Sequence, residues 1–183
     1  MESKLFTPVT FGPLTLRNRT IRSAAFESMC PGNAPSDMLL DYHRSVAAGG
    51  IGMTTVAYAA VTQSGLSFDR QLWMRPEIIP GLRRLTDAIH AEGAAAGIQL
   101  GHCGNMSHKS ICGCMPVGAS SGFNLYSPTF VRGLRADELP EMARAYGRSV
   151  NLAREAGFDS VEIHAGHGYL TVSYTHLRAH ETR

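Results

Sequence analysis

Two histidines and a tyrosine, His164, His167 and Tyr169, stand close together near the end of the sequence. His164 ends the stretch 158–164, where apolar and polar side chains alternate as they do in a half-buried β-strand, and the other two follow it. Glycines separate them, and glycine lets a backbone turn sharply or approach a ligand closely. Imidazole and phenol groups exchange protons and donate hydrogen bonds, so this strand exit is a candidate site of acid–base chemistry.

The same spacing is compatible with two other interpretations. The two imidazoles could be structural residues whose hydrogen bonds are satisfied inside the protein. They could also be two ligands of a metal ion, which would need at least one further partner. His102 would supply that third ligand, and the chain would then be a metal-dependent barrel hydrolase using His102, His164 and His167.

The composition is that of a globular chain with no evident nucleic-acid or membrane partner. Of the 183 residues, 44% are hydrophobic and 17% are charged, and the net charge of +2 comes without a long basic run. The first residues lack the pattern of a signal peptide, and no apolar run is long enough to cross a membrane. We therefore expect a cytoplasmic protein without a nucleic-acid or membrane partner.

The four cysteines form no recognisable disulfide framework. Cys112 and Cys114 are separated by one glycine, which is one residue short of the Cys-x-x-Cys spacing of metal and redox sites. We expect these two residues, together with Cys30 and Cys103, to be reduced thiols.

The elements that must position the candidate residues alternate between strands and helices. We expect a hairpin at 9–16, strands at 20–26, 51–61, 94–100 and 158–164, helices at 36–48, 76–93 and 137–157, and a long irregular segment at 102–135. This alternation predicts a parallel sheet with helices outside it. In an α/β barrel, catalytic residues lie at the carboxyl ends of the strands, where residues 164–169 would be.

Several motifs resemble one known family in the same order along the chain. They are Leu5-Phe-Thr-Pro8, Leu16-Arg-Asn-Arg19, Gly97-Ile-Gln-Leu-Gly-His-Cys-Gly104, Glu155-Ala-Gly-Phe-Asp159 and Val161-Glu-Ile-His-Ala-Gly-His-Gly-Tyr-Leu170. The chain is similar to the Old Yellow Enzyme family of flavin-dependent NAD(P)H oxidoreductases and ene reductases. The resemblance implies a TIM (β/α)8 barrel that holds FMN across its C-terminal mouth, with NADH or NADPH as the reductant.

The resemblance also implies a role for individual residues. The expected FMN-binding residues are Ser23, Ala24, Ala25, Phe26, Tyr58 and Gln99. Gln99 offers a carbonyl and an amide to the edge of the flavin pyrimidine. Many relatives carry Thr or Cys in place of Phe26, and that side chain bonds the flavin carbonyl, which a phenylalanine cannot do.

The implied reaction is the passage of hydride from NAD(P)H through flavin to an activated alkene or a similar electrophile. His164 and His167 would donate hydrogen bonds to the oxygen of the acceptor, where charge accumulates. Tyr169 would supply a proton to the adjacent carbon. Besides the hydrolase, a non-catalytic barrel relative remains an alternative, and homo-oligomerisation of the whole protein remains open.

The resemblance covers only the first half of a barrel, because relatives continue with four more βα units. We expect residues 1–170 to be the N-terminal half of an FMN-binding TIM barrel, truncated after about four βα units. Residues 172–182 match the translation of an adapter used in transposase-based sequencing libraries, so we expect residues 171–183 to be foreign to the native protein. A sequencing read of the native locus that continued through these codons would contradict this.

Overall fold

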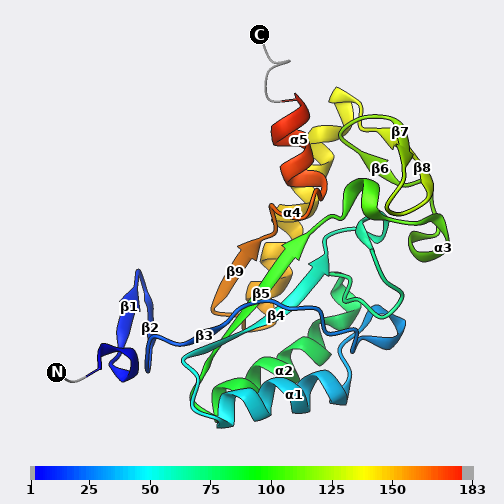
Figure 1. The fold of residues 1–183 in the computed structure, drawn as a ribbon. Coiled ribbons are helices and arrows are strands. Elements are labelled where there is room, and N and C mark those ends of the chain that lie inside the picture. The colour runs from blue at the N-terminus through cyan, green and yellow to red at the C-terminus, as the bar shows by residue number, and fades with distance from the viewer. Residues whose placement is uncertain (1–2, 179–183) are drawn as a thin grey trace.

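A four-stranded parallel sheet organises the chain, whose computed structural model describes residues 3–178 (Figure 1). The strands lie in chain order: β3 (Ile21–Arg22), β4 (Met53–Ala60), β5 (Ala95–Gly101) and β9 (Ser160–Ile163). All three strand pairs are parallel, and a helix lies between successive strands in the sequence. This confirms the expected α/β fold, while both outer strands keep an unpaired edge within the described residues.

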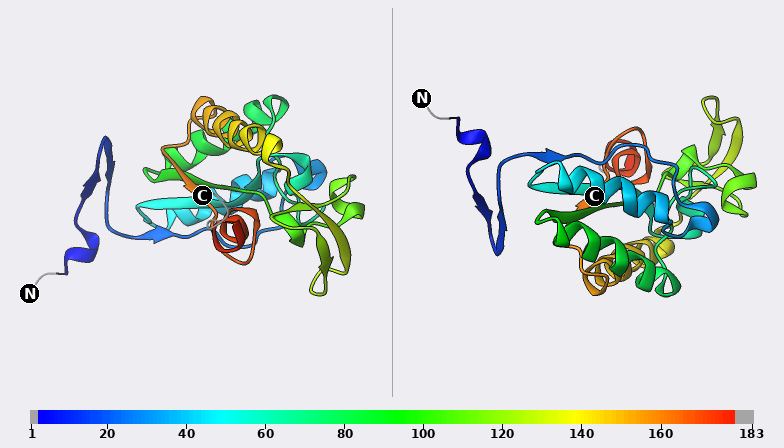
Figure 2. Two further views of the ribbon diagram at one scale, coloured as in Figure 1. Left: turned by 90° about the horizontal axis from the view of Figure 1, so that it is seen from above. Right: turned by 90° about the horizontal axis from the view of Figure 1, so that it is seen from below.

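Three helices, α1 (Asp37–Ala48), α2 (Ile79–Ala91) and α4 (Leu139–Glu155), cover one face of the sheet (Figures 1 and 2). The Ser36 hydroxyl caps α1 by accepting a hydrogen bond from Leu39 N at 3.2 Å, as its residue type predicts. The residues buried between helices and sheet include Leu39, Val56, Leu82, Leu85, Ile89, Ile98, Leu100 and Ala153. Their burial leaves the other face of the sheet for the site.

Strand β5 shows how the two faces divide. Its residues Ala96, Ile98 and Leu100 belong to the buried core under the helices. Because side chains alternate along a strand, Gln99 and the glycines on either side of it lie on the opposite face. The small residues there leave room above the sheet.

The first strand is shorter than the expected span of 20–26. Its pairing with β4 ends after Arg22, and the ladder between β4 and β5 shifts register between Val56 and Ala59. At this irregularity the Ala57 N–H is bonded by the Glu27 carboxylate at 3.2 Å instead of by a strand. A side chain thus replaces the strand that the sequence predicted, and residues 24–30 run past the sheet as irregular backbone.

The sequence predicted that the segment 102–135 is irregular, but it contains regular elements. It contains the short helix α3 (Lys109–Cys112) and a small sheet of β6 (Val117–Gly118), β8 (Thr129–Gly133) and β7 (Gly122–Asn124). The turn between β7 and β8 is held by the Asn124 side chain, which accepts a hydrogen bond from Tyr126 N at 2.9 Å. Strands of two to five residues are too short for periodicity to reveal.

Two elements lie at the periphery of the molecule. The expected hairpin, β1 (Val9–Phe11) with β2 (Leu14–Leu16), stands away from the body (Figures 1 and 2). Helix α5 (Leu170–Arg178) follows the candidate site and begins with the buried Leu170. It overlaps the start of the expected foreign tail, whose residues 179–183 lie outside the described part of the chain. No described helix combines the length and the apolar character that a bilayer crossing requires.

Glu27 should be the residue whose loss unfolds this arrangement most readily. Its carboxylate, 5% exposed, lies 2.9 Å from Arg22 Nη1 and 3.0 Å from His43 Nε2. Removing one partner of a buried ion pair leaves the other charge uncompensated, so Glu27→Ala should lower the free energy of unfolding by about 3 kcal/mol. Urea unfolding followed through Trp73 fluorescence, at concentrations low enough to keep the chain monomeric, measures this.

A matched control is Asp37→Asn, which removes an exposed ion pair with Arg84. Its midpoint should stay unchanged, because exposed pairs contribute little. Equal midpoints for the Glu27 and Asp37 variants would contradict the role given to Glu27.

Candidate functional site

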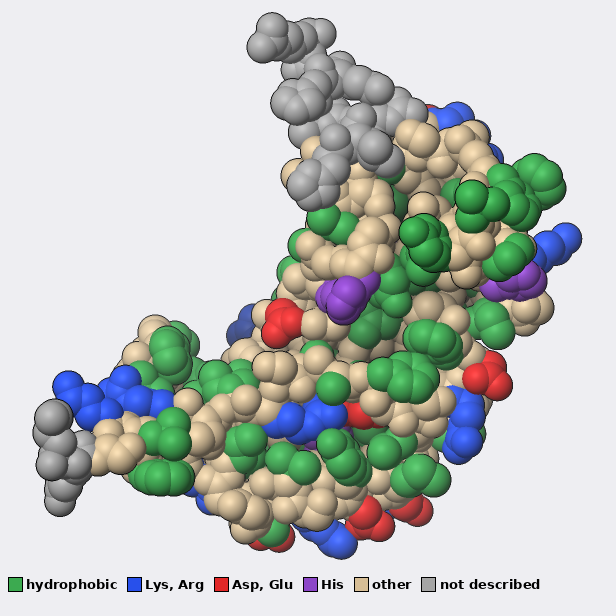
Figure 3. All heavy atoms as spheres, viewed as in Figure 1, with side chains coloured by type: hydrophobic (Ala, Val, Ile, Leu, Met, Phe, Trp, Pro, Cys, Tyr) green, Lys and Arg blue, Asp and Glu red, His purple; other side chains and the backbone are tan. Residues whose placement is uncertain are grey.

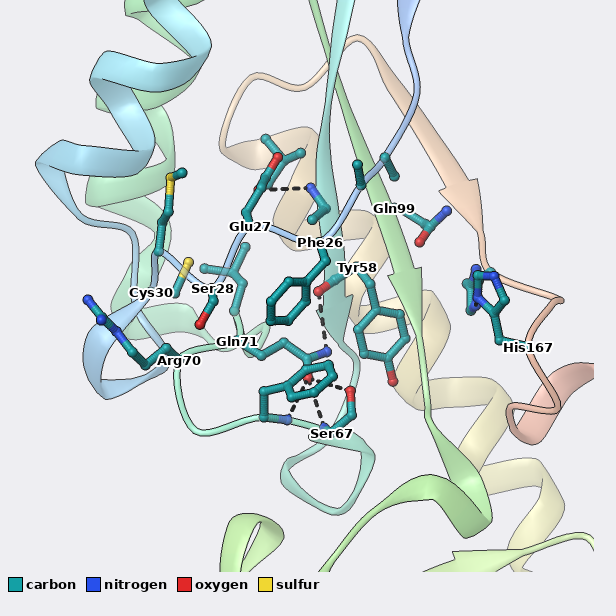
Figure 4. Close-up of a pocket in the computed structure, with 18 of the residues that line it drawn as sticks. Phe26, Glu27, Ser28, Cys30, Tyr58, Ser67, Arg70, Gln71, Gln99 and His167 are labelled. Atoms are coloured by element: carbon teal, nitrogen blue, oxygen red, sulfur yellow. Dashed lines mark hydrogen bonds between the residues drawn. The ribbon is translucent and has the colours of Figure 1, made fainter. Parts of the chain in front are cut away.

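A pocket of about 280 Å³ lies on the open face of the sheet, where the strands end (Figure 4). Of the residues predicted from the sequence, eight line it: Ala24, Ala25, Phe26, Tyr58, Gln99, His164, His167 and Tyr169. Ser23, the ninth, is not among the lining residues. In the space-filling view, histidine side chains lie near the middle of this face beside hydrophobic ones (Figure 3).

The pairing of β5 with β9 brings the predicted residues together. Gln99 lies opposite Glu162, and the next pair is Leu100 with Ile163. The His164 N–H then donates to the Leu100 carbonyl at 2.8 Å, which extends the ladder to the first histidine. Residues 65 positions apart in the sequence therefore face one pocket.

The two histidines converge on one point in space. Nδ1 of His167 lies 3.2 Å from Nε2 of His164. A tight turn places them so: His167 has φ of 56°, and the Tyr169 N–H donates to the Gly166 carbonyl at 3.0 Å. Because a non-glycine residue with positive φ is uncommon, this backbone serves the placement of its side chain. In this contact one ring nitrogen donates and the other accepts, and an oxygen that replaced it could accept hydrogen bonds from both rings.

Burial shifts the pKa values of His164 and Tyr169 in opposite directions. It lowers the pKa of His164 below its usual value, and the neighbouring His167 lowers it further. Burial also raises the pKa of Tyr169 above its usual value. At neutral pH the site therefore holds a neutral His164 and a phenol that keeps its proton, which are hydrogen-bond and proton donors respectively.

The Tyr58 ring packs against two of the candidate catalytic side chains. It contacts His164 and Tyr169 edge to face, at centroid distances of 5.7 and 5.4 Å. Its hydroxyl donates to the Gly65 carbonyl at 2.7 Å, and burial raises the pKa of this phenol well above its usual value. A Cβ at Gly101 would lie 2.1 Å from the Tyr58 ring, so only glycine fits there.

Gln99 is held in one orientation by a neighbouring strand. Its amide nitrogen donates to the Glu162 carboxylate. The amide oxygen, for which no hydrogen bond is recorded among the described residues, is turned toward the side of the pocket where His167 lies (Figure 4). Gln99 therefore presents an acceptor to any ligand above the sheet.

The far side of the pocket is a loop that sequence reasoning missed. Gln71 organises it: Oε1 accepts hydrogen bonds from the Ser67 N–H at 2.8 Å and from the Phe68 N–H at 3.3 Å. Phe68 packs edge to face on Phe26 at 4.6 Å, and Arg70 stands at the end remote from His167 (Figure 4). Since this loop follows no periodic pattern, only its polar residues next to a strand end could have pointed to it.

His102 does not join the other two histidines. It is fully buried, its Nδ1 accepts from the Gly104 N–H at 3.0 Å, and its Nε2 contacts the Ser64 hydroxyl at 3.0 Å. Both ring nitrogens are thus committed to the protein, and burial lowers the pKa of His102 to about 4. No cluster of three His, Cys, Asp or Glu suited to a metal occurs within residues 3–178, so the predicted hydrolase site is not assembled.

The chain is similar in sequence and in structure to several known proteins. The chain is 42% identical to the 4,4'-dithiodibutanoate disulfide reductase of Rhodococcus erythropolis, over 93% of the chain and 42% of that protein. It is 35% identical to an NADPH dehydrogenase of Listeria monocytogenes, over 92% of the chain and 50% of that protein. The solved structure of the old yellow enzyme homologue from Zymomonas mobilis superposes with a TM-score of 0.84 at 27% identity, covering 92% of the chain and 50% of its own.

The chain thus spans about half the length of these relatives. The sequence model of one family, described as NADH:flavin oxidoreductase / NADH oxidase, matches residues 4–181. Nearly the whole chain is covered by that match. The chain belongs to the NADH:flavin oxidoreductase / NADH oxidase family.

Proposed function

We propose that residues 1–170 form the first half of an FMN-dependent oxidoreductase that reduces an electrophilic small molecule with NADH or NADPH. The observation that carries the proposal is the convergence of the two imidazole nitrogens, 3.2 Å apart, in the same pocket as Tyr169 and Gln99. The chemistry that FMN supplies when bound is the relay of hydride from NAD(P)H to the acceptor.

The pocket residues fit a flavin ring. Because the Gln99 amide nitrogen donates a hydrogen bond to Glu162, the amide oxygen would be left to accept one from the imide N–H of a flavin ring. Ala24 and Ala25 are small enough to let their backbone approach a flat ring. The phosphate of FMN would need another site, since barrels of this kind usually bind phosphate with the loops after strands seven and eight.

The acceptor would lie with one oxygen between the two histidines. Imidazoles that each point an N–H at that oxygen stabilise the negative charge that develops there. Tyr169 holds its proton at neutral pH because burial raises its pKa, and it can pass that proton to the carbon or heteroatom that becomes basic. Tyr58 holds His164 and Tyr169 in place through ring contacts.

Arg70 supports a narrower choice of acceptor. The pocket between it and the histidines is lined largely by apolar residues, among them Phe26, Met29, Phe68 and Leu72. No ion pair of Arg70 is recorded among the described residues, so its guanidinium can meet an anionic group of a ligand. A similar protein is named for a disulfide with two carboxylates, and we propose that this chain also favours an acceptor with a carboxylate tail.

The second half of the site lies beyond this chain. Both outer strands of the sheet lack a partner within the described residues, and exposed backbone edges promote association. The N-terminal hairpin adds exposed side chains such as Phe11, and its neighbour Phe6 is 72% exposed. We therefore propose that four further strands close the barrel in the whole protein.

The 183-residue chain by itself should bind little FMN and should self-associate through its open strand edges. A chimera that joins residues 1–170 to the second half of the Rhodococcus disulfide reductase should be monodisperse and yellow. Absorbance near 450 nm and size-exclusion chromatography measure both properties. A yellow, monodisperse preparation of the 183-residue chain would contradict the half-site proposal, and a folded but colourless chimera would contradict flavin binding.

Tyr169→Phe in the chimera should slow reduction of the acceptor by about 100-fold, because it removes a proton donor while keeping the ring. His164→Ala should slow the same step through loss of a hydrogen-bond donor. Reduction of the flavin by NAD(P)H should stay within about twofold of the unchanged chimera in the Tyr169 variant, since that step requires no proton from the phenol.

Stopped-flow measurement of the two half-reactions separates these effects. His108→Gln, at an exposed histidine bonded to Ser110, serves as the control and should leave both steps unchanged. Equal slowing of both half-reactions in the Tyr169 variant would argue against its role as a proton donor.

Arg70→Gln should raise KM for 4,4'-dithiodibutanoate by about tenfold, as expected for loss of a hydrogen bond to a charged group. The dimethyl ester of the same disulfide has no charge to offer, so its KM should hardly change. Arg44→Gln, on the exposed side of α1 where it pairs with Asp41, is the matched control. If the Arg70 variant raised both KM values alike, the residue would not select for charge.

A further inference from the structure

A second pair of reactive side chains lies outside the pocket. Cys112 ends helix α3, and Cys114 follows after Gly113, whose φ is 71°. The two sulfur atoms are 3.6 Å apart, and the Cys112 thiol donates to the Cys114 carbonyl at 3.2 Å. Cys112 is buried and Cys114 is exposed. The Cys114 thiol is therefore accessible to a solute, and the Cys112 thiol lies next to it inside the protein.

We propose that Cys112 and Cys114 form a thiol–disulfide exchange site for small-molecule disulfides, separate from the pocket of His164 and His167. A disulfide joins sulfur atoms about 2.05 Å apart, so each thiol must move by less than about 1 Å to close the bond. Gly113 makes this possible because its left-handed backbone folds the two cysteines toward each other. Glycine is the residue that adopts this conformation without strain.

The other two cysteines do not offer the same chemistry. Cys30 and Cys103 are buried, and burial raises the pKa of each thiol to about 12. Cys103 in addition donates to the Leu66 carbonyl at 3.4 Å. Neither has a thiol partner recorded within hydrogen-bond distance among the described residues. Exchange should therefore be confined to Cys112 and Cys114 at the C-terminal end of α3.

The exchange conserves atoms and electrons in two steps. The Cys114 thiolate attacks one sulfur of a disulfide R–S–S–R, the S–S bond breaks, and one RS⁻ leaves and takes a proton from water. Cys112 then loses its proton to water and attacks the Cys114 sulfur, which releases the second RS⁻. The protein loses two electrons and forms one internal S–S bond, while the disulfide becomes two thiols.

The pH dependence of the first step follows from the environment of Cys114. Partial burial, together with the neighbouring Cys112, raises the pKa of the Cys114 thiol to about 11. Only the thiolate attacks a disulfide. Little thiolate is present at neutral pH, and its fraction rises about tenfold for each unit by which the pH increases, as long as the pH stays below the pKa. The rate of exchange should rise accordingly between about pH 7 and pH 9.

Oxidation by glutathione disulfide tests the proposal. The chain is incubated at about pH 8 with a series of oxidised-to-reduced glutathione ratios, quenched with acid and digested with trypsin. Cleavage after Lys109 and Arg132 gives a peptide that contains both Cys112 and Cys114 and no other cysteine. This peptide should lose the mass of two hydrogen atoms, while the peptides with Cys30 and Cys103 keep their thiols.

Two serine variants and an unfolded control separate the outcomes. Cys112→Ser should accumulate a glutathione adduct on Cys114, and Cys114→Ser should acquire neither an adduct nor an internal bond. In urea the unchanged chain should need a ratio of oxidised to reduced glutathione at least tenfold higher for half-oxidation, because the unfolded backbone does not hold the two thiols together. A lasting glutathione adduct in the unchanged chain, or equal midpoints with and without urea, would overturn the proposal.

The same peptide can be followed in the chimera, which tests the pair in a closed barrel. Internal oxidation there, with the flavin spectrum intact, would support a site independent of the pocket. Loss of flavin in step with oxidation would overturn that independence.

Discussion

The parallel pairing of β5 with β9 is the constraint on which the rest of the site depends. It sets Gln99 opposite Glu162 and carries the ladder one bond further, from the His164 N–H to the Leu100 carbonyl. A shift by one residue would turn Gln99 into the core and the apolar Ile98 toward the pocket. The buried residues of α2 and α4 prevent that shift, because they pack on the core face of the same strand.

Polar contacts of Glu27 and the packing of Tyr58 both shape the open face of that sheet. The contacts of Glu27 with Arg22, His43 and the Ala57 N–H hold an irregular stretch of backbone where a strand would otherwise continue. This frees residues 24–30 to border the pocket, while Tyr58 fills the space beneath the histidines. Stability and site geometry thus depend on the same few buried polar contacts.

Much of the fold and part of the site could be predicted from the sequence. The helices begin and end close to the predicted residues because caps and glycines mark them locally, as Ser36 does. The pairing of His164 with His167 follows from three-residue spacing after a strand. The loop around Gln71 and the small sheet of β6, β7 and β8 could not be predicted, because their contacts join residues without periodic patterns. The origin of residues 171–183 stays a prediction.

Gly101 limits how this pocket can be altered by protein engineering. Even the methyl group of alanine would collide with the aromatic ring at position 58, whose displacement would loosen the histidines and the phenol together. Directed evolution of substrate range should therefore leave that position alone. Better candidates are the rim positions 68–70, whose side chains are exposed to solvent.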